Sequence, residues 1–195
     1  MRDTPSARLA IQAAMTGHQV WSTLHANDAF GIIDRMVDLG LPLSMMTDPT
    51  IVTGLICQRL LKILCPHCKK PLASVIEKGK ETSEQKRIMS VVGLDITTAF
   101  VVGHGCEHCR NTGIAGRTCA AEIVVPDHGL MRLLRSGDRE GAISYWRERG
   151  GKSVLAVALE KINGGLVDPF QAEEEVGPLN SLPGHSLARE AGALS

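Results

Sequence analysis

The chain has 195 residues, a formal net charge of zero and 44% hydrophobic residues, of which few are aromatic. This length predicts one or two domains with an aliphatic core, and the neutral charge argues against bulk electrostatic binding to nucleic acid or to an anionic membrane. No stretch reaches the roughly 18 consecutive apolar residues of a membrane span, and the polar N-terminus does not resemble a secretory signal. We therefore expect a cytoplasmic protein, in which the six cysteines indicate metal ligands or buried thiols rather than disulfides.

The N-terminal third of the chain alternates helical and strand patterns. A helix is predicted over residues 5–16, with Thr4 as its cap, and a second helix over residues 28–39. Between them, the β-prone segment 20–24 predicts a buried strand. This succession is typical of a parallel α/β sheet, and a further helical stretch is expected over residues 49–56.

The remaining two thirds predict short strands and then a run of helices. Strands are expected over 58–64, 100–102 and 117–125, and the charged excursion 77–87 is expected to be partly helical. Residues 177–195 are rich in Gly, Pro, Ser and Ala, which predicts a disordered tail. Four helical patterns precede this tail, over 127–135, 138–148, 152–163 and 168–175.

Two C-x2-C pairs carry the clearest chemical signal. Cys65 and Cys68 form the first pair, and Cys106 and Cys109 form the second after 37 intervening residues. Each pair places two sulfur atoms on one tight turn, and two such turns give the tetrahedral four-sulfur cage that zinc accepts in structural sites. The long separation is explained by the charged excursion, because a longer surface loop costs little closure entropy. The sequence therefore predicts a structural zinc site.

Other interpretations of these residues remain open. A single C-x2-C pair could be a redox pair, although this leaves the second pair unexplained. A histidine, His67, His104 or His108, could replace one cysteine as a ligand. Cys57 and Cys119 belong to no pair and are expected to be small buried residues.

Short motifs follow one another along the first two thirds of the chain. They are Arg2-Asp3, Ser6-Ala7, Thr16-Gly17-His18, Ser22-Thr23-Leu24-His25-Ala26-Asn27-Asp28-Ala29, Cys57-Gln58-Arg59-Leu60, Cys65-Pro66-His67-Cys68, and Gly116-Arg117-Thr118 with Glu122. In this order they resemble the type II secretion and type IV pilus ATPases, whose "His box" has histidines matching His18 and His25. The resemblance covers about residues 1–175, and Cys119 stands where the family usually has a glycine. The ending Val167-Asp168-Pro169 is similar to that of plasmid-type thin-pilus members.

The resemblance implies an α/β fold with several parts. Residues 1–64 would be the C-terminal half of a RecA-like P-loop NTPase domain. Residues 65–125 would be a four-cysteine zinc subdomain with a charged insertion at about 77–90. Residues 126–176 would form a helical C-terminal subdomain, followed by the tail over 177–195.

The resemblance also implies roles for single residues. His25 would hydrogen-bond a γ-phosphate, since ligands of open α/β sheets bind beyond the carboxyl ends of strands. His18 would be a second sensor, and Arg2 and Arg59 would lie near the nucleotide or a subunit boundary. Each histidine could instead only satisfy a nearby backbone group.

The resemblance further implies ATP and Mg²⁺ as cofactors of the full-length protein, and a homo-hexamer peripherally associated with the inner membrane through an inner-membrane platform protein. However, the pattern G-x-x-x-x-G-K-[ST] is absent from the sequence: Gly151-Lys152-Ser153 imitates its end, but Trp146 stands where the first glycine is required. The Walker B glutamate of the family would lie just before Met1. We therefore expect a C-terminal part of an ATPase that is inactive alone. The alternative is a stand-alone zinc-containing interaction module, or a truncated regulator of a complete ATPase.

Overall fold

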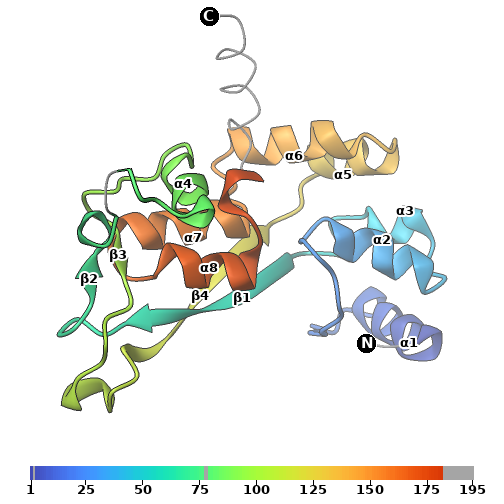
Figure 1. Cartoon of the computed structure of the whole chain (residues 1–195). Helices are drawn as coiled ribbons and strands as arrows, with labels where there is room; N and C mark the ends of the chain where they lie inside the picture. The colour runs from blue at the N-terminus through green and yellow to red at the C-terminus, as the bar shows by residue number, and fades with distance from the viewer. Residues whose placement is uncertain (2, 77–78, 182–195) are drawn as a thin grey trace, which may run out of the picture. The chain divides into compact units, whose positions relative to one another are not determined.

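The computed structural model describes residues 1, 3–76 and 79–181 (Figure 1). The chain divides into two compact units, each built from two segments of sequence. The first unit comprises residues 1–57 and 122–152, and the second comprises residues 58–121 and the residues from 153 onward. The C-terminal helices, which we expected to form one subdomain over 126–176, are therefore shared between the two units.

Three helices form the N-terminal part of the first unit. Asp3 caps the first of them, instead of Thr4 as we expected, because its carboxylate accepts the backbone N–H of Ser6. The second ends at Asp38, and Gly40 just beyond it has a φ of 85°, the left-handed conformation that a glycine adopts without strain. The bounds of these helices are α1 Thr4–Met15, α2 Gly31–Asp38 and α3 Leu43–Met46.

Two predictions for this part of the chain are wrong. Residues 20–24 form no strand, and Trp21 is 79% exposed. Within the described ranges no strand pairs with this segment, so its β-prone side chains have no sheet to pack against. The segment 49–56 forms turns that lead into a strand, and the helix of this region, α3, precedes it.

The longest strands are β1 (Leu55–Leu64) and β4 (Ile114–Val124), which pair with each other. Both strands were predicted, and each begins three residues earlier than the sequence indicated. The side chains of Leu55, Cys57 and Leu61 are buried, and Ile56 between the first two is exposed, which is the alternation expected of a strand with one covered face. The mixed α/β class is thus confirmed, although the sheets in the described residues are two-stranded.

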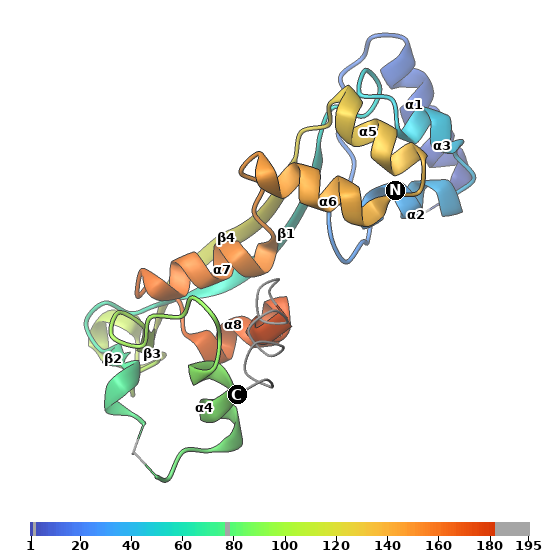
Figure 2. The same ribbon diagram turned by 90° about the horizontal axis from the view of Figure 1, so that it is seen from above.

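The second unit adds a small antiparallel sheet and three helices. β2 (Lys70–Pro71) pairs with β3 (Phe100–Val101), and Lys70 lies opposite Val101. Figures 1 and 2 show α7 lying along the long strands β1 and β4, with α8 beside it. The single-turn helices η1 and η2 belong to the same unit. The bounds are η1 Leu72–Ser74, α4 Ser83–Met89, η2 Glu107–Cys109, α7 Val154–Asn163 and α8 Pro169–Val176.

An aliphatic core holds the second unit together, as the composition predicted. The helix α4, which begins within the charged excursion, contributes Ile88, and this side chain is fully buried. Residues 177–181, which we expected to belong to the disordered tail, include the short helix η3 (Leu179–Ser181), and Leu179 is also fully buried. The rest of the expected tail lies outside the described residues. Other members of this core are Leu61, Leu72, Val91, Ala99, Ala120, Ala158, Ile162 and Val167.

Two more helices complete the first unit. α5 spans His128–Arg135 and α6 spans Arg139–Glu148, close to their predicted bounds. Each begins at an aspartate, Asp127 or Asp138, whose carboxylate accepts a backbone N–H of the first turn. Among the residues that the structure describes, no helix is long and apolar enough to cross a membrane.

Candidate metal centre

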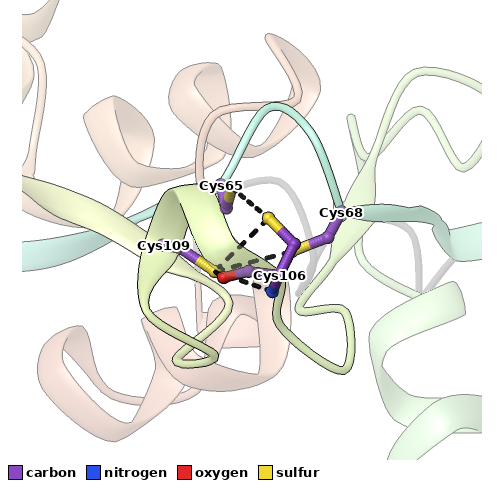
Figure 3. A group of neighbouring side chains, drawn as sticks. All are labelled: Cys65, Cys68, Cys106 and Cys109. Carbon is purple, nitrogen blue, oxygen red and sulfur yellow. Dashed lines mark hydrogen bonds between the residues drawn. The ribbon is translucent and has the colours of Figure 1, made fainter.

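The two C-x2-C pairs come together in the second unit. Cys65 and Cys68 lie on the turn that follows β1, and Cys106 and Cys109 lie on the turn that contains η2. Figure 3 shows the four side chains converging from these two turns. The backbone N–H of Cys65 donates to the carbonyl oxygen of Gly113 at 2.8 Å, which ties the first turn to the start of β4.

The sulfur atoms have the spacing of a tetrahedral metal cage. The Sγ–Sγ distances are 3.8 Å for Cys65 and Cys106, 3.8 Å for Cys106 and Cys109, and 3.9 Å for Cys68 and Cys109. All four Sγ atoms lie within 4.8 Å of one another. A regular tetrahedron with Zn–S bonds of about 2.3 Å has edges of about 3.8 Å. The donor set and its size therefore fit a metal ion, and no disulfide joins these thiols.

Backbone groups stabilise a thiolate at one corner of the cage. The Sγ of Cys109 accepts the N–H of Cys106 and the N–H of Gly113, both at 3.2 Å. Burial raises the pKa of the Cys109 thiol, but these two donors, together with hydrogen bonds from the Cys106 and Cys68 side chains, outweigh burial and bring the pKa to about 6. Burial and the neighbouring thiols raise the pKa of Cys68 to about 12. A bound cation would favour the deprotonated form of these cysteines and so offset the effect of burial, because a metal ion binds cysteine as the thiolate.

Glycines allow the two turns to approach so closely. A Cβ atom on Gly103 would lie 1.7 Å from the carbonyl oxygen of Cys68, on the first turn. Gly105 has a φ of 93°, and a Cβ atom there would lie 2.5 Å from the backbone of Asn111. Gly103 carries no local sequence signal, since the chain it approaches lies 35 positions away.

The histidines near the cysteines make other contacts. His67 and His108 are exposed, and their rings lie 4.1 Å apart, centroid to centroid. His104 Nε2 lies 2.7 Å from the Nζ of Lys70. The metal-ligand cluster found within the described ranges consists of the four cysteines alone, so the geometry gives no support to a histidine ligand.

The two predicted nucleotide-site histidines belong to the first unit, whereas Arg59 belongs to the second unit, as the four cysteines do. His18 and His25 are exposed and belong to the first unit, in a segment without helix or strand. Thr16 Oγ1 lies 3.0 Å from His18 Nδ1, and His18 lines a cavity of about 600 Å³ in this unit. Arg59 lies on β1, where its Nη1 donates to the carbonyl oxygen of Gln58 at 3.0 Å. Arg2 lies outside the described residues.

Comparison with known proteins gives the family. Residues 1–176 match the model of the Type II/IV secretion system protein family. The chain belongs to this family. It is 36% identical to the type II secretion system protein E of Aeromonas hydrophila over 164 residues, which are 83% of this chain and 30% of the relative. It is 38% identical to the type IV pilus assembly ATPase TfpB of Acinetobacter baylyi over 158 residues, 81% of this chain and 26% of the relative.

A third member of the secretion-protein family has a similar relation to the chain. The type II secretion system ATPase E of Vibrio cholerae is 31% identical over 166 residues, which are 85% of this chain and 31% of the relative. The chain therefore spans less than a third of the length of these family members. The resemblance inferred from the ordered motifs is confirmed by these matches.

Glu122, the last residue of one family motif, has a clear place in the first unit. Glu122 is 6% exposed, and its Oε1 accepts the backbone N–H of Ala29 at 2.8 Å. In the sequence, Glu122 indicated only the family resemblance and had no predicted partner. A lone glutamate in a predicted strand could have indicated a structural hydrogen bond, because a carboxylate that is buried in a strand requires hydrogen-bond donors.

Proposed function

We propose that this chain is the C-terminal part of a hexameric ATPase that powers type II secretion or type IV pilus assembly. The observation that carries the proposal is the family match over residues 1–176, together with relatives that bear those activities in their names. In the complete protein, ATP and Mg²⁺ would bind chiefly to parts of the family fold that precede the matched region. The complete protein would work in the cytoplasm, against an inner-membrane platform protein.

The four cysteines are proposed to hold one structural zinc ion. Cys65, Cys68, Cys106 and Cys109 would supply four thiolate ligands, which leaves no open coordination position for a substrate. The ion would then stabilise the second unit rather than take part in ATP hydrolysis. It would link the turn after β1 to the turn before β4, which the two hydrogen bonds to Cys109 Sγ already orient.

His25 is proposed to contact the γ-phosphate of ATP, with His18, Arg2 and Arg59 near the nucleotide or a subunit boundary. The exposure of His25 supports this role, because its ring is accessible to a ligand in the first unit. The family match over residues 1–176 supports the idea that the first unit belongs to a larger RecA-like domain.

The DNA immediately upstream of the Met1 codon tests this proposal. We expect an in-frame Gly-Glu directly before Met1 and a G-x-x-x-x-G-K-[ST] pattern further upstream. Protein made from this longer frame should hydrolyse ATP. A stop codon and a ribosome-binding site directly upstream, with a well-folded chain that binds no nucleotide, would instead support a zinc-containing interaction module.

A further inference from the structure

The backbone that follows His25 is held from three sides within the first unit. The N–H of Ala29 donates to the buried carboxylate of Glu122 on β4. The Sγ of Cys57, on β1, lies 3.5 Å from the carbonyl oxygen of Asn27. These two contacts attach residues 27–29 to both long strands, only two to four positions after His25.

The third contact is an ion-pair bridge from α6. Both carboxylate oxygens of Asp28 lie near Nη2 of Arg139, at 2.8 and 2.9 Å. The other terminal guanidinium nitrogen, Nη1, donates to Asp34 on α2. Asp28 also accepts the N–H of Gly31 at 2.6 Å, at the start of α2. Arg139 therefore joins the segment that contains His25 and Asp28, residues 25–30 and here called the His25 loop, to the helix α2 that follows it.

The helix that carries Arg139 is itself fixed to the same strand end. Trp146 of α6 donates its Nε1–H to the carbonyl oxygen of Ile123 at 3.0 Å, next to Glu122. The Trp146 ring also packs edge-on against Phe30, with centroids 5.6 Å apart. Because Phe30 follows Ala29 in the chain, α6 contacts the His25 loop and the strand that holds it. Arg139 thus extends from a helix that is attached to β4 and to Phe30.

The side chains of this ion-pair bridge are exposed, so the bridge is expected to orient the residues it joins more than to stabilise the fold. The side chains of Arg139, Asp28 and Asp34 are 38%, 44% and 69% exposed. Ion pairs that are this exposed contribute little to the stability of the fold, because water screens them. A guanidinium shared between two carboxylates nevertheless restricts direction, since its donors are planar and fixed.

We propose that Arg139 is a positioning residue for His25, acting together with Glu122 through the backbone of residues 27–31. It holds Asp28 and α2 in one arrangement, so that the His25 ring is presented to the nucleotide in a single orientation. This inference rests on the proposed role of His25 at the γ-phosphate. It also makes α6 a route by which movement of the C-terminal helices of the first unit changes the nucleotide site.

The first arm of the test uses the chain as it is. Hydrogen exchange of the amides of residues 26–33 should become several-fold faster in Arg139→Met, while the melting temperature changes little. Arg147→Met is the matched control, because Arg147 is exposed on the same helix. Arg139→Lys should give an intermediate exchange rate, since lysine keeps the positive charge but lacks the planar guanidinium that binds two carboxylates at once. Unchanged exchange in Arg139→Met would overturn the positioning role.

The second arm uses the complete ATPase that carries this chain. Arg139→Met should lower kcat by about 10- to 100-fold with little effect on ATP affinity, since a small misplacement of a reacting group is costly. In the His25→Ala background, Arg139→Met should cost nothing further. Additive losses in the double variant would overturn the positioning role but leave the function of His25 intact. If His25→Ala alone were harmless, the proposed function of His25 would fail instead.

Discussion

The carboxylate of Asp168 accepts the backbone N–H of Val102 at 2.8 Å, although 66 residues separate the two positions. The same carboxylate caps α8 by accepting the N–H of Phe170 at 2.8 Å. Asp168 is 2% exposed, so it connects the segment after β3 to α8 inside the second unit. This segment leads directly into the second cysteine pair.

Replacing Asp168 should therefore cost more than removing an ordinary helix cap. Asp168→Ala leaves the partly buried N–H groups of Val102 and Phe170 without their acceptor, which should lower the free energy of unfolding by about 2–4 kcal/mol. Ser153→Ala is the matched control, since Ser153 caps α7 through one hydrogen bond to the N–H of Ala156. It should cost only about 1 kcal/mol. Denaturant unfolding measures both, and equal costs would show that the contact with Val102 is unimportant.

The stability difference between the wild type and Asp168→Ala should also depend on pH. Burial raises the pKa of Asp168 above its usual value, against the opposing effect of its three backbone donors. A carboxyl whose pKa is raised in the folded state stabilises the fold most below its unfolded pKa, and this contribution declines as pH rises through the folded pKa. The cost of Asp168→Ala should thus be larger near pH 4 than near pH 7. A cost that grows with pH would contradict this.

Two truncations test where the folded part of the chain ends. Removal of residues 177–195 deletes Leu179, which is fully buried in the core of the second unit. This should lower the free energy of unfolding by roughly 2–5 kcal/mol, as for other large core deletions. Removal of residues 182–195 alone should leave the melting temperature unchanged. A loss of several degrees in the shorter truncation would show that those residues stabilise the fold.

The cysteines predict a clear difference between two conservative substitutions. Cys106→Ser removes one corner of the four-sulfur cage and should reduce zinc content well below one ion per chain, with loss of folded structure in the second unit. Cys119→Ser is the control, because the Cys119 Sγ donates to Gln58 Oε1 at 3.4 Å and lies outside the cage. Elemental analysis of protein purified without chelator measures both. Equal zinc content in the two variants would rule out Cys106 as a ligand.

Local chemistry made much of the fold predictable. Helices with an aspartate or serine at the N-cap, such as those after Asp138 and Ser153, were placed within two residues of their observed starts. The two C-x2-C pairs predicted their own meeting, because a four-sulfur metal site needs two sulfur atoms from each pair. The same reasoning failed for residues 20–24, where a β-prone pattern has no pairing strand within the described ranges.

Contacts between distant positions could not be read from the sequence. Arg139 and Asp28 lie 111 positions apart, and neither occupies a periodic apolar pattern that would indicate a partner. Leu179 looked like part of a polar tail, because one leucine between Pro178 and Asn180 carries no periodicity. Its burial depends on a core formed by segments that begin more than 100 residues earlier, such as Leu61.

The rate of ATP hydrolysis by the complete protein tests the central claim most directly. His25→Ala should lower kcat by about 10²–10³-fold, because it removes one group positioned at the developing charge, while ATP affinity changes little. Rate and affinity should be measured separately on the wild type and the variant, with matched zinc content. A wild-type protein that hydrolyses ATP, and a variant that is slow but binds ATP normally, is the predicted result. A complete protein that shows no hydrolysis, or a His25→Ala variant with an unchanged rate, would contradict the account.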